Sequence, residues 1–232
     1  MTKSSFKSVF HRIIKPALVF LFFVWILPLM ISVIINLLRL SFYKGYQGWL
    51  LTNIFLYVVP IIFLSFFLKK NTDHAILESP RFVSITISLL FVALNLLLTM
   101  VLHKFLPTPV ASNQTDVLST LSNSSILGVQ LELLTITFLG PIFEELMCRG
   151  VLMNFYFKKS KYGFDVILSA IIFSIFHQHQ NLIVLLPYFI VGLLLGILYR
   201  LTGKVQYTML VHILINTIIA WPYIQDNVII FL

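Results

Sequence analysis

Residues 82–102 read FVSITISLLFVALNLLLTMVL and contain no charged side chain. With a rise of about 1.5 Å per residue, a helix of this length is about 30 Å long, which matches the hydrocarbon core of a bilayer. This apolar stretch decides the fold, because it predicts a helix that crosses a membrane.

The composition of the whole chain agrees with this prediction. Of the 232 residues, 59% are hydrophobic and only 10% are charged, against about 25% in an ordinary soluble domain. A soluble fold of this size would expose more apolar surface than so few charges could keep in solution. We therefore predict an integral membrane protein with the lipid bilayer as its immediate partner.

Further apolar runs predict an all-α, polytopic transmembrane helix bundle of seven spans, or eight if one end segment re-enters the bilayer. Besides residues 82–102, the predicted spans are Ala17–Leu38, Trp49–Leu68, a fourth that begins near Ile126, Phe164–Phe176, Leu182–Tyr199 and Tyr207–Ile224. Residues 103–125 are polar and predict an external loop. We interpret residues 1–102 as a scaffold of three spans, and residues 126–232 as the part that carries the buried polar side chains.

The basic residues predict the orientation of the chain. Alternate ends of the predicted spans carry 12 Lys and Arg on the amino-terminal side and 3 on the other side, and Arg149 lies within a span. Cytoplasmic loops are enriched in Lys and Arg, so the amino terminus of this multi-pass protein of the cell membrane is predicted to be cytoplasmic. Topology then explains the net charge of +8, and we expect no nucleic-acid partner.

Ionisable side chains inside predicted spans are energetically costly and are therefore functional candidates. The fourth span contains Glu144, Glu145 and Arg149. On a helix, Glu145 and Arg149 lie one turn apart on the same face, and Glu144 points about 100° away from Glu145. One arginine cannot neutralise two carboxylates, so one carboxylate is left for chemistry.

Two more polar clusters lie in the fifth and seventh spans. His177 follows Phe173 by one turn, and Asn216 follows His212 by one turn. With a rise of about 1.5 Å per residue, Glu144 and His177 each lie about 20 Å from the cytoplasmic ends of their spans, and Asn216 lies about 14 Å from its own. The three polar faces can therefore meet in the cytoplasmic half of the bilayer.

Each cluster has both a structural and a functional interpretation. The acidic pair with Arg149 can lock the bundle as an ion-pair cluster, and His212 with Asn216 can join two helices by a hydrogen bond. Alternatively, a carboxylate acts as a general base, and the His212–Asn216 pair donates hydrogen bonds to a developing oxyanion. A zinc site of Glu144, His177 and His212 competes with both, but the HExxH signature is absent.

Taken together, the clusters resemble the CPBP intramembrane proteases, a family of CAAX prenyl endopeptidases and bacteriocin-processing or self-immunity proteins often labelled Abi. The family pattern is EExxxR, then FxxxH, then HxxxN or HxxxB. The matching residues are Glu144, Glu145 and Arg149, then Phe173 and His177, then His212 and Asn216. The resemblance covers roughly Leu127 to Trp221 and implies that residues 126–232 form a four-helix catalytic core.

The resemblance also implies residue roles and a function. Glu144 would activate the attacking water with help from His177, while Glu145 and Arg149 would hold the site in shape. We expect a bacterial intramembrane endopeptidase that cleaves a peptide or membrane-protein substrate, and we favour a metal-free mechanism over one with Zn. The alternative is a non-catalytic bacteriocin self-immunity protein or a regulator of a membrane sensor kinase.

Overall fold

The computed structural model describes residues 14–27, 30, 54–72, 77–105, 126–156, 163–177 and 182–228. Its elements are all helices, with π-helical segments labelled η, which confirms the all-α prediction. In chain order they are α2 (Lys15–Leu21), η2 (Phe22–Ile26), η4 (Ile54–Val58), α5 (Val59–Asn71), α6 (Phe82–Phe105), α8 (Ile126–Leu134), η5 (Thr135–Leu139), α9 (Gly140–Glu145), η6 (Leu146–Tyr156), α10 (Phe164–His177), α11 (Leu182–Thr202) and α12 (Val205–Val228).

Among the described residues, three helices are long and apolar enough to cross a membrane by themselves. They contain the stretches Phe82–Leu102, Leu185–Thr202 and Val205–Gln225, and the shorter α10 is also apolar. Most of the predicted external loop, and the second half of the first predicted span, lie outside the described residues. The number of spans therefore stays a prediction.

The fourth predicted span is one continuous run of helix that alternates between α and π turns, from α8 through η5 and α9 to η6. The N–H of Gly140 donates to the carbonyl of Thr135, five residues earlier. Pro141 follows directly and has no N–H to continue the ladder. The π turn therefore comes immediately before the proline. Because Pro141 has no N–H, one backbone carbonyl of this turn needs another hydrogen-bond donor.

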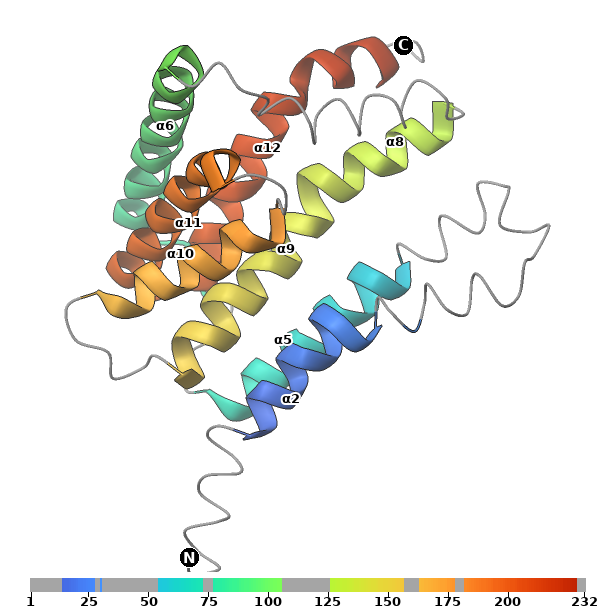
Figure 1. The fold of residues 1–232 in the computed structure, drawn as a ribbon, viewed down its shortest axis with the longest axis vertical. Coiled ribbons are helices and arrows are strands. Elements are labelled where there is room, and N and C mark those ends of the chain that lie inside the picture. Colours follow the sequence, from blue (N-terminus) through green and yellow to red (C-terminus); the bar gives the residue numbers. More distant parts are fainter. Residues whose placement is uncertain are drawn as a thin grey trace, which may run out of the picture.

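The other helices pack on opposite sides of this long helix, as Figure 1 shows. α6, α10, α11 and α12 form one group, in which α10 packs closely on α11, and α6 packs on both α11 and α12. α12 also packs along α8, η5 and α9, whereas α2 and α5 contact η6. The long helix therefore contacts the amino-terminal helices on one side and the carboxyl-terminal helices on the other.

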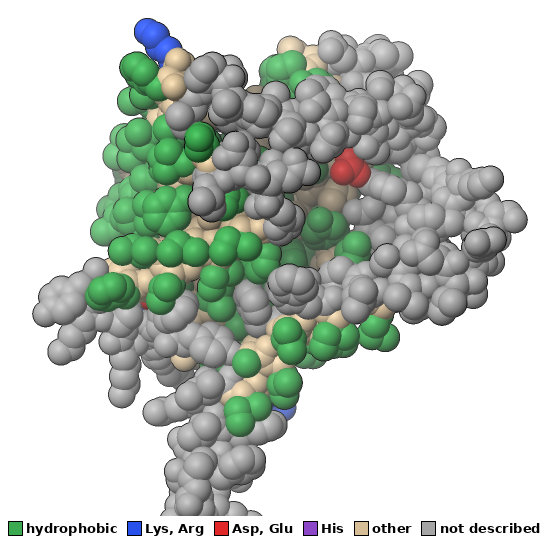
Figure 2. All heavy atoms as spheres, viewed as in Figure 1, with side chains coloured by type: hydrophobic (Ala, Val, Ile, Leu, Met, Phe, Trp, Pro, Cys, Tyr) green, Lys and Arg blue, Asp and Glu red, His purple; other side chains and the backbone are tan. Residues whose placement is uncertain are grey.

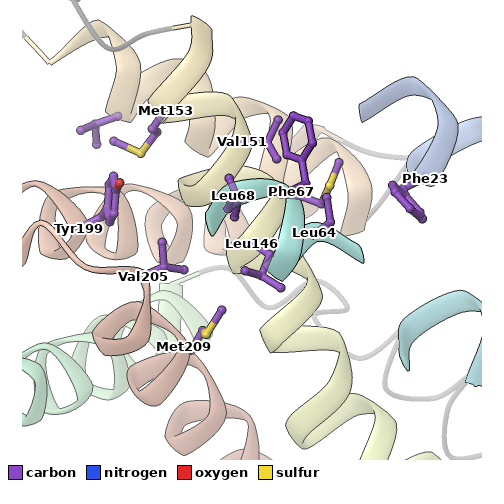
Figure 3. Close-up of a cluster of buried hydrophobic side chains, with 12 residues drawn as sticks. Phe23, Leu64, Phe67, Leu68, Leu146, Val151, Met153, Tyr199, Val205 and Met209 are labelled. Atoms are coloured by element: carbon purple, nitrogen blue, oxygen red, sulfur yellow. The ribbon is translucent and has the colours of Figure 1, made fainter. Parts of the chain in front are cut away.

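A buried apolar cluster joins α5 to η6 and reaches α12 (Figure 3). Leu64 and Leu68 of α5 pack with Leu146 and Val151 of η6, and all four are almost fully buried. Gly150 permits this close approach, because a Cβ at its position would lie 2.5 Å from Cδ1 of Leu68. The second predicted span is thus packed directly on the helix that carries the acidic pair.

The outward faces of the helices are apolar, as in a protein surrounded by lipid. On α6, Phe82, Leu90, Leu97 and Met100 are more than half exposed, and Figure 2 shows hydrophobic side chains covering the region of this helix. So large an apolar surface is unfavourable in water and favourable in a bilayer. The chain is an integral membrane protein.

Gly192 and Gly196 let α11 lie directly on α10. A Cβ on Gly192 would lie 3.0 Å from the backbone Cα of Ala170, and a Cβ on Gly196 would lie 2.9 Å from Cγ1 of Val166. Because the α10 backbone cannot move aside, we expect Gly192→Ala to lower the free energy of unfolding by about 1–3 kcal/mol, the usual effect of overpacking.

A second substitution tests this explanation. Val166→Ala removes the methyl group that would obstruct a side chain at Gly196, so it should restore stability to Gly196→Ala. It should not restore Gly192→Ala, whose obstacle is backbone. Thermal unfolding of the purified variants in detergent measures both effects, and equal rescue of the two glycine variants would contradict the assignment.

Candidate active site

Glu145 and Arg149 form a fully buried ion pair at the centre of the bundle. Nη1 of Arg149 donates to Oε1 of Glu145 at 2.8 Å, and both side chains have no exposed area. The predicted pairing over one helical turn is therefore present. The same carboxylate is approached by Nδ1 of His212 at 3.1 Å and by the Thr208 hydroxyl, both on α12.

Arg149 extends these contacts to the two remaining helices of the core. Its Nη2 donates to the carbonyl of Gly192 on α11 at 2.7 Å. Its guanidinium carbon lies 5.2 Å from the centroid of the Phe173 ring on α10, within the range of a cation–π contact. The Glu145–Arg149 pair consequently joins the long helix to α10, α11 and α12.

Glu144 faces two imidazole rings from different helices. Its Oε2 lies 3.6 Å from Nε2 of His177 and 3.8 Å from Nε2 of His212. These distances are too long for hydrogen bonds, and Oε2 is buried with no hydrogen-bond partner among the described residues. The structure thus brings together the three side chains that the helix periodicity placed on facing surfaces.

The ring of His177 contacts two aromatic rings and makes a hydrogen bond through one nitrogen. Its centroid lies 4.5 Å from that of Phe173 and 4.5 Å from that of Tyr188. Nδ1 lies 2.8 Å from the carbonyl oxygen of Phe173. A carbonyl only accepts hydrogen bonds, so Nδ1 carries a hydrogen and donates. This leaves Nε2 as the nitrogen that can exchange a proton with Glu144.

Glu145 fixes the orientation of His212 by accepting a hydrogen bond from Nδ1, as the Phe173 carbonyl does for His177. The Glu145 carboxylate, already paired with Arg149, accepts a hydrogen bond from Nδ1 of His212 at 3.1 Å. Nδ1 therefore carries a hydrogen, and Nε2 is directed toward Glu144. This arrangement of a carboxylate behind an imidazole fixes both the tautomer and the direction of the ring.

Asn216 makes a hydrogen bond between two helices, the kind of structural role that its sequence position allowed beside oxyanion stabilisation. Its Nδ2 donates to the carbonyl of Ile136 at 2.9 Å, which joins α12 to η5. In the π register of this turn, the partner of that carbonyl would be the N–H of residue 141, and Pro141 has none. Asn216 thus satisfies a backbone acceptor that the proline leaves without its donor.

In the alternative zinc set, the Glu144 carboxyl oxygen lies somewhat farther from each histidine nitrogen than two ligands of one zinc ion do. Within the described ranges, no group of three or more His, Cys, Asp or Glu side chains is arranged to hold a metal ion. The nearest combination is Glu144 with His177 and His212, whose oxygen-to-nitrogen distances are 3.6 and 3.8 Å. Tetrahedral zinc with ligands at its usual bond lengths would bring such atoms to about 3.3 Å of each other.

The segment that carries this buried cluster matches a known family. Residues 126–218 match the family described as Rce1-like, type II CAAX prenyl endopeptidase. This segment contains all six predicted site residues. Over these residues the chain is similar to the Rce1-like family, and this match confirms the resemblance found in the three motifs.

Two curated proteins are similar to this part of the chain. One is an "Uncharacterized 24.3 kDa protein" of Escherichia coli, 33% identical over 102 residues, which cover 42% of this chain and 46% of the relative. The other is the "Putative membrane peptidase YdiL" of Bacillus subtilis (strain 168), 29% identical over 95 residues, which cover 41% and 38%. The matches thus span less than half the length of each relative, and no solved structure matches the chain significantly.

Two residues near the site were absent from the sequence-based candidates. Thr208 lies one turn before His212 on the same face of α12, a spacing that could have identified it. Tyr57 lies in η4, in the second predicted span, and its ring approaches α9 beside Glu144. No motif marks Tyr57, and it lies outside the segment that matches the family.

Proposed function

We propose that this chain is an intramembrane endopeptidase that hydrolyses a peptide bond with water activated by Glu144 and His177. The observation that carries the proposal is the position of Glu144. Its carboxyl oxygen faces Nε2 of two histidines on separate helices and makes no hydrogen bond of its own among the described residues. A carboxylate held in this way can accept a proton from a water molecule placed between it and a substrate carbonyl.

The proton can then follow a short path. As the water oxygen bonds to the carbonyl carbon, Glu144 takes the water proton. When the carbon–nitrogen bond breaks, a proton must reach the leaving amine, and Glu144 or Nε2 of His177 delivers it. Because Nδ1 of His177 donates to Phe173, only Nε2 takes part in this exchange.

Stabilisation of the oxyanion is proposed for His212 and Asn216. His212 already donates through Nδ1 to Glu145, so its Nε2 can donate to an oxyanion only when both ring nitrogens carry hydrogen. Asn216 uses its amide nitrogen on the carbonyl of Ile136, and that amide has a second hydrogen. Removal of one such donor typically costs about 2.7–4 kcal/mol of transition-state stabilisation.

The orientation and organisation of the chain are part of the same proposal. Arg200 pairs with Asp165, and Lys204 pairs with Glu78, at one end of the bundle. This charged end corresponds to the loops predicted to be cytoplasmic, and it supports a multi-pass protein with a cytoplasmic amino terminus. The two bacterial relatives support a bacterial origin. Residues 126–232 would form the catalytic core, residues 103–125 an external loop and residues 1–102 the three-span scaffold.

The substrate is proposed to be a peptide or a membrane protein cleaved near the cytoplasmic face. Purified protein in liposomes can be tested with a mixture of internally quenched transmembrane peptides and with a farnesylated CAAX peptide. We expect hydrolysis by the native chain and its loss in His177→Ala. If His177→Ala, at normal membrane level, retains full activity or full biological protection, the non-catalytic immunity or sensor-kinase regulator is the better explanation.

Metal dependence is tested by the same assay. The metal-free mechanism predicts that hydrolysis persists in a strong chelator such as 1,10-phenanthroline, and that mass spectrometry finds no stoichiometric zinc in active protein. Loss of activity in the chelator, followed by recovery on addition of Zn²⁺, would favour a zinc enzyme with Glu144, His177 and His212 as ligands.

A further inference from the structure

Tyr57 of the second predicted span lies beside the acidic end of α9. Its ring meets the Phe143 ring edge to face, with a centroid distance of 6.0 Å and an interplanar angle of 89°. A Cβ placed on Gly140 would lie 4.0 Å from Cε1 of Tyr57 and 3.9 Å from Oε1 of Glu144. The tyrosine ring and the glutamate carboxyl therefore flank the same point on α9.

The Tyr57 hydroxyl lies in the field of two carboxyl groups. The charges of Glu144 and Glu132, which belong to the same long helix, both act on it. Within the described part of the chain, neither this hydroxyl nor Oε2 of Glu144 has a hydrogen-bond partner. Tyr57 is partly buried, a tyrosine hydroxyl in apolar surroundings normally finds an acceptor, and a carboxylate is a strong one.

We propose that Tyr57 is a positioning residue for Glu144, donating its hydroxyl hydrogen to the carboxylate directly or through one bridging water. This inference rests on the proposed function of Glu144. The hydroxyl holds the carboxyl group toward His177. The ring contacts Phe143 and lies close to Gly140, and these neighbours set the position of the hydroxyl. The second span is then a working part of the site, although it lies outside the segment that matches the family.

Two substitutions test the hydroxyl and the ring of Tyr57 separately. Tyr57→Phe keeps the edge-to-face contact with Phe143 and removes only the hydroxyl, whereas Tyr57→Leu removes both. Tyr199→Phe is the matched control, because its hydroxyl donates to Asn154 at 3.0 Å in another part of the bundle. A purely structural role of Tyr57 would make Tyr57→Phe indistinguishable from the native protein.

Labelling with dicyclohexylcarbodiimide tests the contact without knowledge of the substrate. This reagent attacks protonated carboxyl groups in apolar surroundings, and a donated hydrogen bond favours the ionised form. Peptide mass spectrometry should show Glu144 labelled about three- to tenfold faster in Tyr57→Phe, the range expected for loss of one hydrogen bond. Tyr199→Phe should label at the native rate.

The peptide-hydrolysis assay supplies a second readout. We expect Tyr57→Phe to lower kcat about tenfold, again the effect of one lost hydrogen bond, with KM changed less than about twofold. Native labelling and native kcat in Tyr57→Phe would overturn the proposal, and so would equal acceleration of labelling in Tyr199→Phe. If labelling changes as expected but Glu144→Gln hydrolyses peptides at the native rate, the contact stands and the proposed catalytic role of Glu144 fails; if the native chain hydrolyses no peptide, the contact stands and the protease function fails.

Discussion

Glu144→Gln is expected to lower the turnover of peptide hydrolysis by about 10²–10⁴-fold, the usual contribution of a general base. Glutamine has nearly the same shape as glutamate, but its amide cannot take a proton from water. Because Oε2 of Glu144 makes no hydrogen bond with any described residue, the substitution breaks no contact that holds the helices together. The melting temperature and the membrane level should therefore match those of the native protein.

Glu145→Gln provides the contrast for this experiment. Glu145 accepts hydrogen bonds from Arg149 and His212 and is completely buried. Loss of its charge should lower the melting temperature as well as activity, whereas Glu144→Gln should lower activity alone. Turnover in the quenched-peptide assay and thermal unfolding in detergent separate the two cases. Native turnover in Glu144→Gln would rule out the proposed role of this carboxylate.

Arg149→Met is expected to have the largest effect on stability. It leaves Glu145 charged and buried without its cation, and it removes the donor to the Gly192 carbonyl. Breaking a buried ion pair from one side typically destabilises a protein by about 3–5 kcal/mol. The variant should therefore unfold at a clearly lower temperature in detergent, or fail to accumulate in the membrane.

A double variant identifies the cause of that loss. Adding Glu145→Gln to Arg149→Met removes the uncompensated charge, so the double variant should be more stable than Arg149→Met alone. It should not reach native stability, because the Gly192 carbonyl still lacks its donor. A double-mutant cycle of unfolding free energies measures this coupling, and strictly additive losses would show that the two side chains are energetically independent.

Features that depend on near neighbours in the chain could be predicted from the sequence. The apolar run at residues 82–102 lies within α6 (Phe82–Phe105). The predicted span Phe164–Phe176 coincides with α10, which extends one residue further, to His177. The Glu145–Arg149 pair followed from its spacing of one helical turn. Helix periodicity and the length of a bilayer crossing act over a few turns of one segment, so they can be read without a fold.

Features that depend on contacts between distant segments could not be predicted in this way. The polar clusters suggested that Glu144, His177 and His212 face one another. Only the folded chain shows that Glu145 orients His212, and that Asn216 donates to the carbonyl of Ile136. The latter contact depends on the π turn before Pro141, and helix propensity does not predict a π turn there.

By itself, therefore, the amino-acid sequence determined a helical membrane protein with three polar faces and one buried ion pair. The tertiary structure decided which atoms of those faces meet, and it placed Tyr57 of the second span beside Glu144. The physical reason is that close approach depends on packing between helices, as where Gly192 rests on Ala170. Such contacts join residues far apart in the chain, so the spacing of these residues along the sequence does not predict them.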